Sequence, residues 1–197
     1  MYEYIHGDLA ELNPSYVVID AAGVGFFVNI SLHTYSALSA LSNNSHCKLF
    51  VHHIIREDAH LLFGFADRQE RELFRLLISV SGIGANTARL ILSSLSPEET
   101  KKAIASQNIT LLKSIKGIGL KTAERIVVDL KDKMNIGVLS GEQVTGMTHG
   151  QTKAEALAGL VTLGFAKTVA EKTIDQIIKD TPNITVEQLV KESLKRL

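Results

Sequence analysis

The sequence predicts a multidomain α+β protein with an N-terminal β-barrel, an all-α domain, a flexible linker and a small C-terminal helical domain. The spacing of apolar residues changes from that of short strands to that of helices near residue 67. Residues 137–152 contain eight Gly, Ser or Thr residues and almost no apolar stripe, as is typical of a flexible linker. The charge changes as well: residues 1–66 carry a net charge of −4, residues 67–136 carry +4, and residues 137–197 are balanced.

Residues 1–66 form the first predicted domain. Its β-rich runs, separated by turn residues, are Tyr2–Asp8, Tyr16–Asp20, Val24–Ile30, Lys48–Ile55 and His60–Phe65. A helix-like stretch over His33–Leu41 lies between the third and the fourth run. Five short strands with one helix among them fit a small closed barrel of the OB type. The same periodicity also fits an SH3-like barrel, and we favour the OB type.

Residues 67–136 form a second, helical domain. Apolar residues recur at helical spacing from Leu73 to Leu130, which indicates about five short helices. Ser96 and Glu99 have the spacing of a capping box, and Pro97 suits the first helical position, so one helix is predicted to begin there.

A third domain, over residues 151–197, is predicted to follow a flexible linker over residues 137–150. It contains three amphipathic stretches, which begin near Leu157, Val169 and Val186. Thr185 with Gln188 is suited to cap the last of them. A bundle of about 47 residues is near the lower size limit for independent folding.

Composition excludes several classes of protein. Lys and Arg number 21, as do Asp and Glu, so this chain of 197 residues is not a general polycation. The single cysteine, Cys47, excludes a disulfide framework and any site built from several cysteines. No run approaches the roughly twenty apolar residues that span a membrane, and no signal peptide opens the sequence. We therefore expect a cytoplasmic protein that binds no membrane.

A duplicated motif in the second domain carries the strongest chemical signal. SVSGIGANTA at residues 79–88 is repeated as SIKGIGLKTA at residues 114–123, which places Gly82 and Gly117 35 residues apart. Each Gly-Ile-Gly segment is expected to join two helices, because glycine allows backbone dihedrals that other residues do not. Backbone N–H groups at the start of the following helix can then bind a phosphate without contacting the bases.

One such turn is more typical of a simple connection between helices, whereas two copies with the same flanks resemble tandem helix-hairpin-helix motifs that bind the DNA backbone. Lys121 and Arg125 would add positive charge on the helix after the second turn. The candidate DNA-binding residues are Gly82, Gly84, Asn86, Thr87, Gly117, Gly119, Lys121, Thr122 and Arg125.

Catalysis is not predicted. Lys121 stands where helix-hairpin-helix DNA glycosylases with lyase activity place their Schiff-base lysine, but Leu139 stands about where the required aspartate would be. The sequence has no P-loop motif, and His52, His53 and His60 lack acidic or cysteine partners at metal-ligand spacing. We expect no catalytic residue, no metal ligand and no cofactor. The alternatives are a nuclease that holds DNA with its hairpins and an adaptor that binds any duplex.

An acidic pair stands between the last two predicted strands of the barrel, in the segment Arg56-Glu57-Asp58-Ala59. On composition alone, this segment is an ordinary hydrophilic hairpin tip. In a protein that binds DNA through another domain, Glu57 and Asp58 could instead act by repelling phosphates and keeping DNA strands apart.

The order of these parts resembles the bacterial RuvA family, the Holliday-junction-recognition subunit of a branch-migration machine. The matching segments are Gly23–Phe26, Arg56–Ala59, Leu62–Phe65, both Gly-Ile-Gly hairpins, Lys121–Arg125 and Leu163–Phe165. Because these segments occur from one end of the chain to the other, the resemblance covers the whole chain and not one domain.

This resemblance implies an OB-fold first domain, a tandem helix-hairpin-helix second domain and a third domain similar to ubiquitin-associated domains. It implies a homotetramer that holds four-way junction DNA open and square in recombination and repair, and leaves open whether eight copies assemble on DNA. Glu57 and Asp58 correspond to the acidic pin of the family. The third domain corresponds to the part that contacts the RuvB ATPase, a hexameric ring, and the RuvC nuclease resolves the junction.

The third domain offers candidates for the contact with the motor subunit. Leu160, Leu163, Phe165 and Leu194 are expected to form an apolar docking face, although their spacing fits a domain core equally well.

Two positions depart from the family pattern. Asn86 and Leu120 stand where members of the family often carry lysine, so the hairpins carry less side-chain charge. The backbone N–H donors remain, and we expect DNA binding to persist with a weaker dependence on salt.

Overall fold

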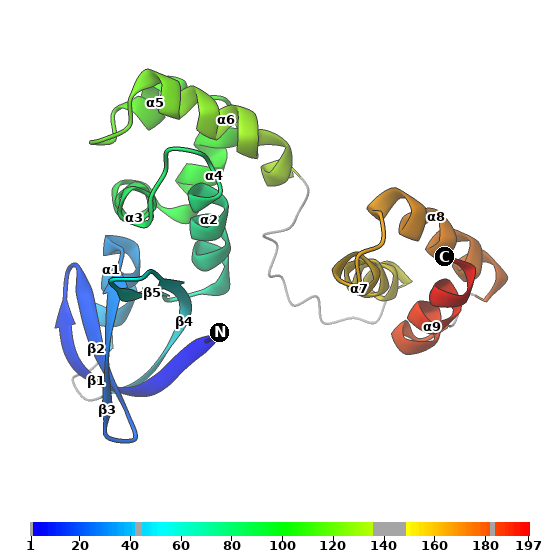
Figure 1. Cartoon of the computed structure of the whole chain (residues 1–197), viewed down its shortest axis with the longest axis horizontal. Coiled ribbons are helices and arrows are strands. Elements are labelled where there is room, and N and C mark those ends of the chain that lie inside the picture. Colours follow the sequence, from blue (N-terminus) through cyan, green and yellow to red (C-terminus); the bar gives the residue numbers. More distant parts are fainter. Residues whose placement is uncertain (1, 42–44, 136–148, 182–183) are drawn as a thin grey trace. The chain divides into compact units, whose positions relative to one another are not determined.

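A computed structural model describes residues 2–41, 45–135, 149–181 and 184–197 (Figure 1). The chain divides into two compact units, Met1–Gly141 and Glu142–Leu197. In the described ranges, no helix is long and apolar enough to cross a membrane. The flexible linker predicted for residues 137–150 lies outside the described residues, apart from its last two residues, which begin helix α7 (His149–Thr162).

The first unit begins with a closed five-stranded barrel, in which the strand order is β1-β2-β3-β5-β4. Its elements are β1 (Tyr4–Asn13), β2 (Tyr16–Ala21), β3 (Val24–Ile30), α1 (Leu32–Ser39), β4 (His46–Ile55) and β5 (His60–Phe65). Neighbouring strands are antiparallel except β3 and β5, which pair in parallel. The five predicted strands and the helix among them are confirmed, and this closed order confirms the OB type.

Strand β1 is longer than predicted, since it continues past Asp8 to Asn13. A register shift after Leu9 lets the strand continue its pairing with β2. Close packing against β2 explains a glycine in this strand: a Cβ atom at Gly7 would lie 2.1 Å from the carbonyl oxygen of Asp20.

The rest of the first unit is helical. Its helices are α2 (Arg68–Ile78), α3 (Ala85–Ser94), α4 (Pro97–Ala105), α5 (Ile109–Lys113) and α6 (Leu120–Asn135). The predicted set of about five helices is confirmed, and so is the capping box that begins α4. There, the Glu99 N–H donates to Ser96 Oγ at 3.2 Å and the Ser96 N–H donates to a Glu99 carboxylate oxygen at 2.8 Å.

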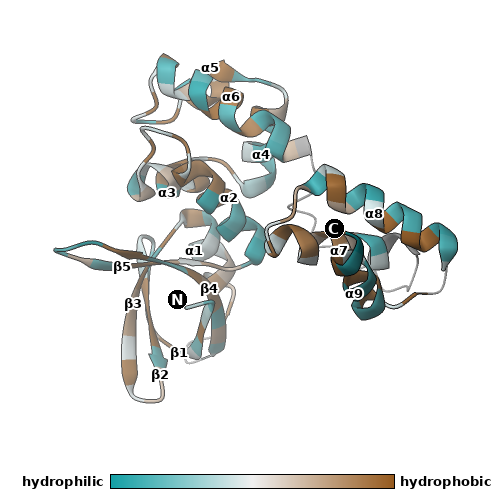
Figure 2. Cartoon of the chain, turned by 45° about the vertical axis from the view of Figure 1, so that its right-hand side comes forward, coloured by the Kyte–Doolittle hydropathy of each residue, from teal (hydrophilic) through white to brown (hydrophobic). Residues whose placement is uncertain are grey.

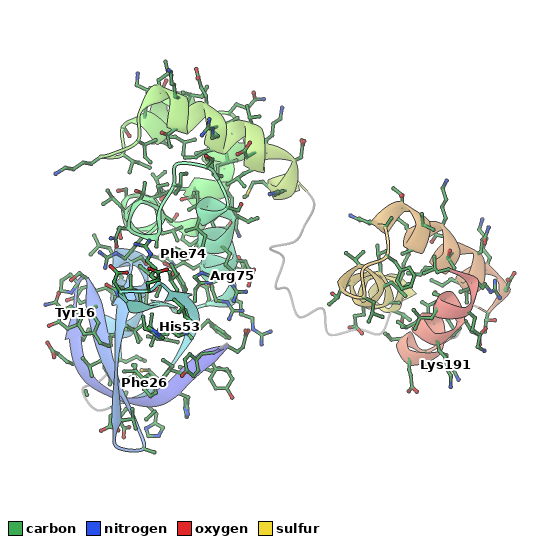
Figure 3. The ribbon with its side chains drawn as sticks, viewed as in Figure 1. Tyr16, Phe26, His53, Phe74, Arg75 and Lys191 are labelled. Atoms are coloured by element: carbon green, nitrogen blue, oxygen red, sulfur yellow. The ribbon has the colours of Figure 1, made fainter. Side chains whose placement is uncertain are left out.

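One hydrophobic core joins the end of the barrel to the helices (Figure 3). The ring of Phe74 on α2 lies 5.2 Å from that of Phe63 and 4.9 Å from that of Phe65, both on β5. Arg71, almost fully buried, donates from α2 to the carbonyl oxygen of Glu3 at 2.8 Å and to its carboxylate at 2.6 Å. These contacts hold the helical domain on the barrel through both apolar packing and charge.

The second unit is a bundle of three helices, α7, α8 (Lys167–Asp180) and α9 (Val186–Arg196). Its core is formed by apolar residues of all three helices, among them Leu160, Ile174 and Leu189. The predicted cap of the last helix is confirmed, because the Gln188 N–H donates to Thr185 Oγ1 at 3.3 Å. Three amphipathic stretches therefore bury their apolar sides against one another, as their spacing predicts.

Candidate nucleic-acid interface

The first Gly-Ile-Gly segment is a tight turn between α2 and α3. Gly82 has a φ of +91°, in the left-handed region that favours glycine. The next residue, Ile83, is only 5% exposed and packs in the core, and its N–H donates to the carbonyl oxygen of Val80 at 3.0 Å. The apolar residue therefore fixes the turn to the core while the glycines on either side lie at the surface.

The second Gly-Ile-Gly segment repeats this geometry between α5 and α6. Gly117 has a φ of +88°, Ile118 is 5% exposed, and the Ile118 N–H donates to the carbonyl oxygen of Ile115 at 3.0 Å. Each feature of the first turn recurs 35 positions later. The duplication inferred from the sequence is thus a duplication of backbone structure.

The second glycine of each turn leaves the start of the next helix open. A Cβ atom built on Gly84 or Gly119 would meet no atom within 4 Å. Gly84 is the N-cap of α3, and no side chain accepts a hydrogen bond from the first turn of that helix. The first N–H groups of a helix have no partner within the helix and favour an anion, so this geometry suits a phosphate.

The two turns lie side by side and are joined by a hydrogen bond. Arg125, on the second turn of α6, donates from Nη1 to the carbonyl oxygen of Ser81, in the first hairpin, at 3.1 Å. Its guanidinium has five N–H donors, so most of them remain for a phosphate. The residue predicted to supply positive charge thus also connects the two hairpins.

The nine candidate DNA-binding residues lie at the surface of these two hairpins. Thr87 and Thr122 are half-buried, and the other seven are exposed. Lys121 is exposed at the start of α6, and Asn86 occupies the equivalent position on α3. The structure therefore brings together all the residues that the duplicated motif singled out.

The acidic pair lies at the tip of the β4–β5 hairpin. The Arg56 N–H donates to the carbonyl oxygen of Ala59 at 2.8 Å, which closes the loop, and both Glu57 and Asp58 are exposed. In the described part of the chain, neither carboxylate forms an ion pair. Figure 2 shows the hairpin extending from the barrel with a hydrophilic tip.

The apolar candidates in the second unit separate into two groups. Leu160 is fully buried in the core of the bundle, whereas Phe165 is half-buried and packs against that core. Leu163 and Leu194 are 61% and 44% exposed. Of the four candidates, Leu163 and Leu194 are therefore the ones exposed for a docking face, which stays a prediction; helical spacing alone does not tell a core side chain from a surface one.

No sequence pattern indicated the residues that place the first hairpin on the barrel. Arg89 of α3 donates to the carbonyl oxygen of Ser15 at 2.8 Å and to Asn29 Oδ1 at 3.3 Å, and its burial lowers the pKa of the guanidinium. These partners lie far apart in the sequence and belong to no motif. Only the folded structure brings them together.

Family comparisons agree with this division of the chain. A model described as the RuvA N-terminal domain matches residues 1–64, and one described as the RuvA C-terminal domain matches residues 152–197. Between them, a model of the SAM-like helix-hairpin-helix tandem matches residues 74–132. The tandem match covers both Gly-Ile-Gly turns.

Proteins named Holliday junction branch migration complex subunit RuvA are similar over their entire length. Those of Bacteroides thetaiotaomicron and Bacteroides fragilis are 52% and 51% identical to this chain, and that of Christiangramia forsetii is 45% identical. In all three comparisons the alignment covers 100% of both proteins. RuvA family models match both ends of the chain, paired hairpins lie between them, and the sequence identity extends over the full length. The chain therefore belongs to the RuvA family.

Proposed function

We propose that this protein is the non-catalytic DNA-binding subunit that recognises four-way junctions and directs a RuvB-type ATPase to them for branch migration. The observation that carries the proposal is the pair of equivalent hairpins, joined through Arg125 and Ser81, whose helix starts are open to phosphates. The names of the relatives support the proposal that the DNA is a four-way junction, since each relative is named as a subunit of a Holliday junction branch migration complex.

Gel-shift titrations on a synthetic four-way junction and on a linear duplex of equal length, at matched salt, test this function. We expect tighter binding to the junction and no strand cleavage when magnesium is added. Equal affinity for both DNAs would favour an adaptor that binds any duplex. Cleavage of either DNA would favour a nuclease.

We further propose that the protein acts as a homotetramer, so that four pairs of hairpins contact the four arms of a junction. Fourfold repetition matches the symmetry of the DNA and gives each arm the same contacts. Native mass measurement with and without a junction distinguishes four copies from eight on the DNA. A monomer under both conditions would contradict the assembly.

Glu57 and Asp58 are proposed to be the acidic pin. Two unit charges about 6–7 Å apart interact by roughly 2–3 kcal/mol at an effective dielectric constant near 20, and less in salt, so these carboxylates repel converging phosphates. Glu57→Gln with Asp58→Asn should leave junction binding equal or tighter and increase duplex binding. Weaker junction binding by this double variant, in the same gel shifts, would contradict a repulsive role.

The second unit is proposed to dock the ATPase through Leu163 and Leu194, while the RuvC resolvase acts on the same complex. Deletion of residues 137–197 should preserve junction binding and abolish stimulation of the ATPase. Leu163→Asp tests the face itself, with Leu160→Val, a mild change in the core, as the control. Full stimulation by Leu163→Asp would exclude Leu163 from the docking face.

A further inference from the structure

A carboxylate is buried where the barrel meets the helical domain. Glu70 on α2 is 0% exposed and accepts hydrogen bonds from Ser31 Oγ and, at 2.6 Å, from Thr34 Oγ1, at the start of α1. In the described part of the chain, no Lys or Arg forms an ion pair with it. Burial raises the pKa of Glu70, because removing a carboxylate from water without a cation is unfavourable.

The two hydroxyl groups cannot supply the missing positive charge. Ser31 Oγ accepts from the Thr34 N–H at 3.0 Å, and Thr34 Oγ1 accepts from the Ala66 N–H at 3.0 Å. Each hydroxyl then has one proton, which it donates to Glu70. This network holds the carboxylate in one orientation, and neither hydroxyl brings a positive charge to it.

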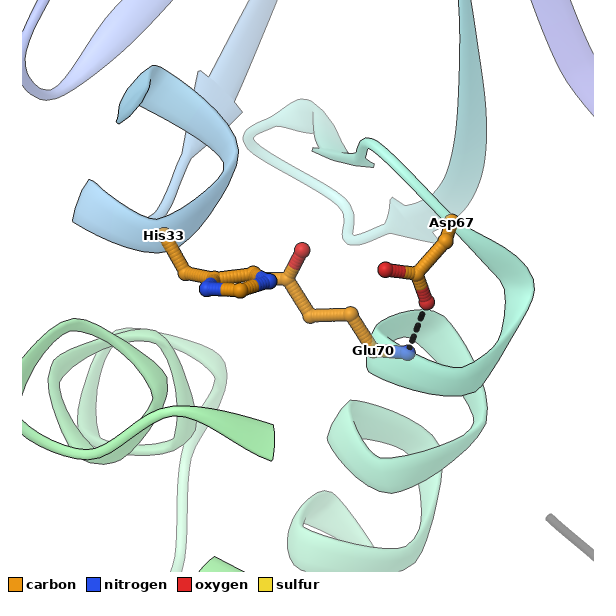
Figure 4. A group of neighbouring side chains, drawn as sticks. All are labelled: His33, Asp67 and Glu70. Atoms are coloured by element: carbon orange, nitrogen blue, oxygen red, sulfur yellow. Dashed lines mark hydrogen bonds between the residues drawn. The ribbon is translucent and has the colours of Figure 1, made fainter. Parts of the chain in front are cut away.

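Two further ligand groups lie beside this carboxylate (Figure 4). One ligand atom each of His33, Asp67 and Glu70 lies within 4.8 Å of the others. Asp67 uses Oδ1 to accept from the Glu70 N–H at 2.8 Å, and its second oxygen has no such role. A carboxylate has about four acceptor positions, so both acids keep lone pairs for another partner.

We propose that His33, Asp67 and Glu70 form a binding site for one divalent transition-metal ion of the zinc class. Zinc binds imidazole nitrogen together with carboxylate oxygen, often with three protein ligands and one open position, whereas magnesium and calcium are bound by oxygen. His33 is half-exposed and Asp67 is exposed, so both can move toward a cation while Glu70 is held by its two hydroxyl donors.

An ion at this site connects the two domains of the first unit. His33 belongs to α1 of the barrel domain, and Glu70 belongs to α2, which leads into the first hairpin. Binding to the folded state alone raises thermal stability by mass action. His33 lies more than thirty positions before the other two residues in the sequence, which explains why spacing between histidines and acids did not indicate the site.

Isothermal titration of Zn²⁺ into the metal-stripped full chain, without DNA, tests the site. His33→Ala and Asp67→Ser should each weaken zinc binding by at least about tenfold and remove the zinc-dependent rise in melting temperature. Asp67→Ser keeps a residue that caps α2, so it separates loss of a ligand from loss of the cap. Mg²⁺ at the same concentration should neither bind nor compete.

His46→Ala is the matched control. His46 contacts Asp8, and its ring lies 5.2 Å from that of His6, so this group also brings histidines and an acid together. We expect His46→Ala to bind zinc as the wild type does. The proposal would be overturned if His46→Ala lost zinc binding while His33→Ala retained it. It would also be overturned if the wild-type protein bound no zinc. If the Asp67→Ser protein does not fold, zinc binding by His33→Ala, a change at a half-exposed residue, tests the proposal by itself.

Discussion

The two hairpins share a backbone and differ in their side chains. Gly82 and Gly117 have φ values of +91° and +88°, and the buried isoleucines make equivalent hydrogen bonds. Yet the first helix turn after the glycines carries Asn86 in one copy and Lys121 in the other. The geometry that presents N–H groups is therefore repeated, whereas the lysine in the first helical turn occurs in the second copy and not in the first.

The two copies also differ in the contacts that their arginines make. Arg89 of the first copy contacts the barrel, and the equivalent position in the second copy is Glu124, which is exposed. Arg125 of the second copy reaches the first hairpin at Ser81. The first hairpin is therefore fixed to its surroundings by Arg89 and Arg125, whereas the second carries the exposed Lys121.

The largest effect is expected from a β-branched residue at the positive-φ glycines. Gly117→Val should lower the free energy of unfolding by about 1–3 kcal/mol through backbone strain, and should weaken junction binding by at least about thirtyfold, equivalent to about 2 kcal/mol. Gly82→Val should have the same effect if the hairpins act equally. Denaturant unfolding and gel shifts measure both quantities.

Gly164→Val is the control for strain, because Gly164 has a φ of +99° in the second unit and not in a hairpin. It should destabilise that unit and leave junction binding unchanged. A folded Gly117→Val protein with normal junction affinity would show that DNA is not bound through these turns.

A smaller effect is expected at the second glycines, where strain is absent. Gly119→Val should fold normally, since a Cβ there meets no atom within 4 Å, and should weaken junction binding by about tenfold by keeping phosphates from the helix start. Gly84→Val tests the first hairpin in the same assay. Unequal losses for the two variants would reveal which hairpin contributes more to binding.

Removing the lysine from the second copy, or adding one to the first, should change the salt dependence of junction binding more than the junction affinity. Lys121→Ala should lower the slope of log affinity against log salt by about one unit, and Asn86→Lys should raise it by about one unit. Neither change should exceed the effect of the glycine variants, because an exposed lysine supplies one point charge. Titrations at several salt concentrations provide the slope. An unchanged slope for Asn86→Lys would show that phosphates do not approach the first hairpin.

The smallest effect concerns the attachment of α2 to the barrel. Burial raises the pKa of Glu70 in the folded state, so the folded protein retains a proton that the unfolded chain releases, and stability falls as pH rises from near the ordinary value of 4.5. Glu70→Gln should remove this decline, on the order of 1.4 kcal/mol for each unit of pKa difference. Unfolding curves between pH 4 and pH 7 in the presence of EDTA measure it. Parallel pH profiles for both proteins would contradict the assignment.

Prediction from the sequence succeeded where structure depends on neighbours in the chain. The capping boxes at Ser96 and Thr185 and the turns at Gly82 and Gly117 follow from residues within a few positions. The same local rules identified the five β-rich runs and the turn residues between them.

Prediction failed where contacts cross the chain. The Glu70 carboxylate and Ser31 are 39 positions apart, and nothing in either segment indicates the hydrogen bond between them. Periodicity identifies an apolar side of the helix that carries Leu160 but not what covers it, so it leaves a docking face and a core position equally open, and the structure buries Leu160 in the core. Both failures concern packing partners, which a pattern along one segment cannot specify.

The hydrogen bond from Arg125 to Ser81 has a consequence for the thermodynamics of association. Because it joins the hairpins before DNA arrives, the distance between the two phosphate-binding points is set during folding. Binding through the two hairpins would then cost little conformational entropy, because their relative position is already set. In the proposed complex, the pair of hairpins would therefore present two phosphate-binding points at a fixed separation and would disfavour DNA whose strands lie closer together or farther apart.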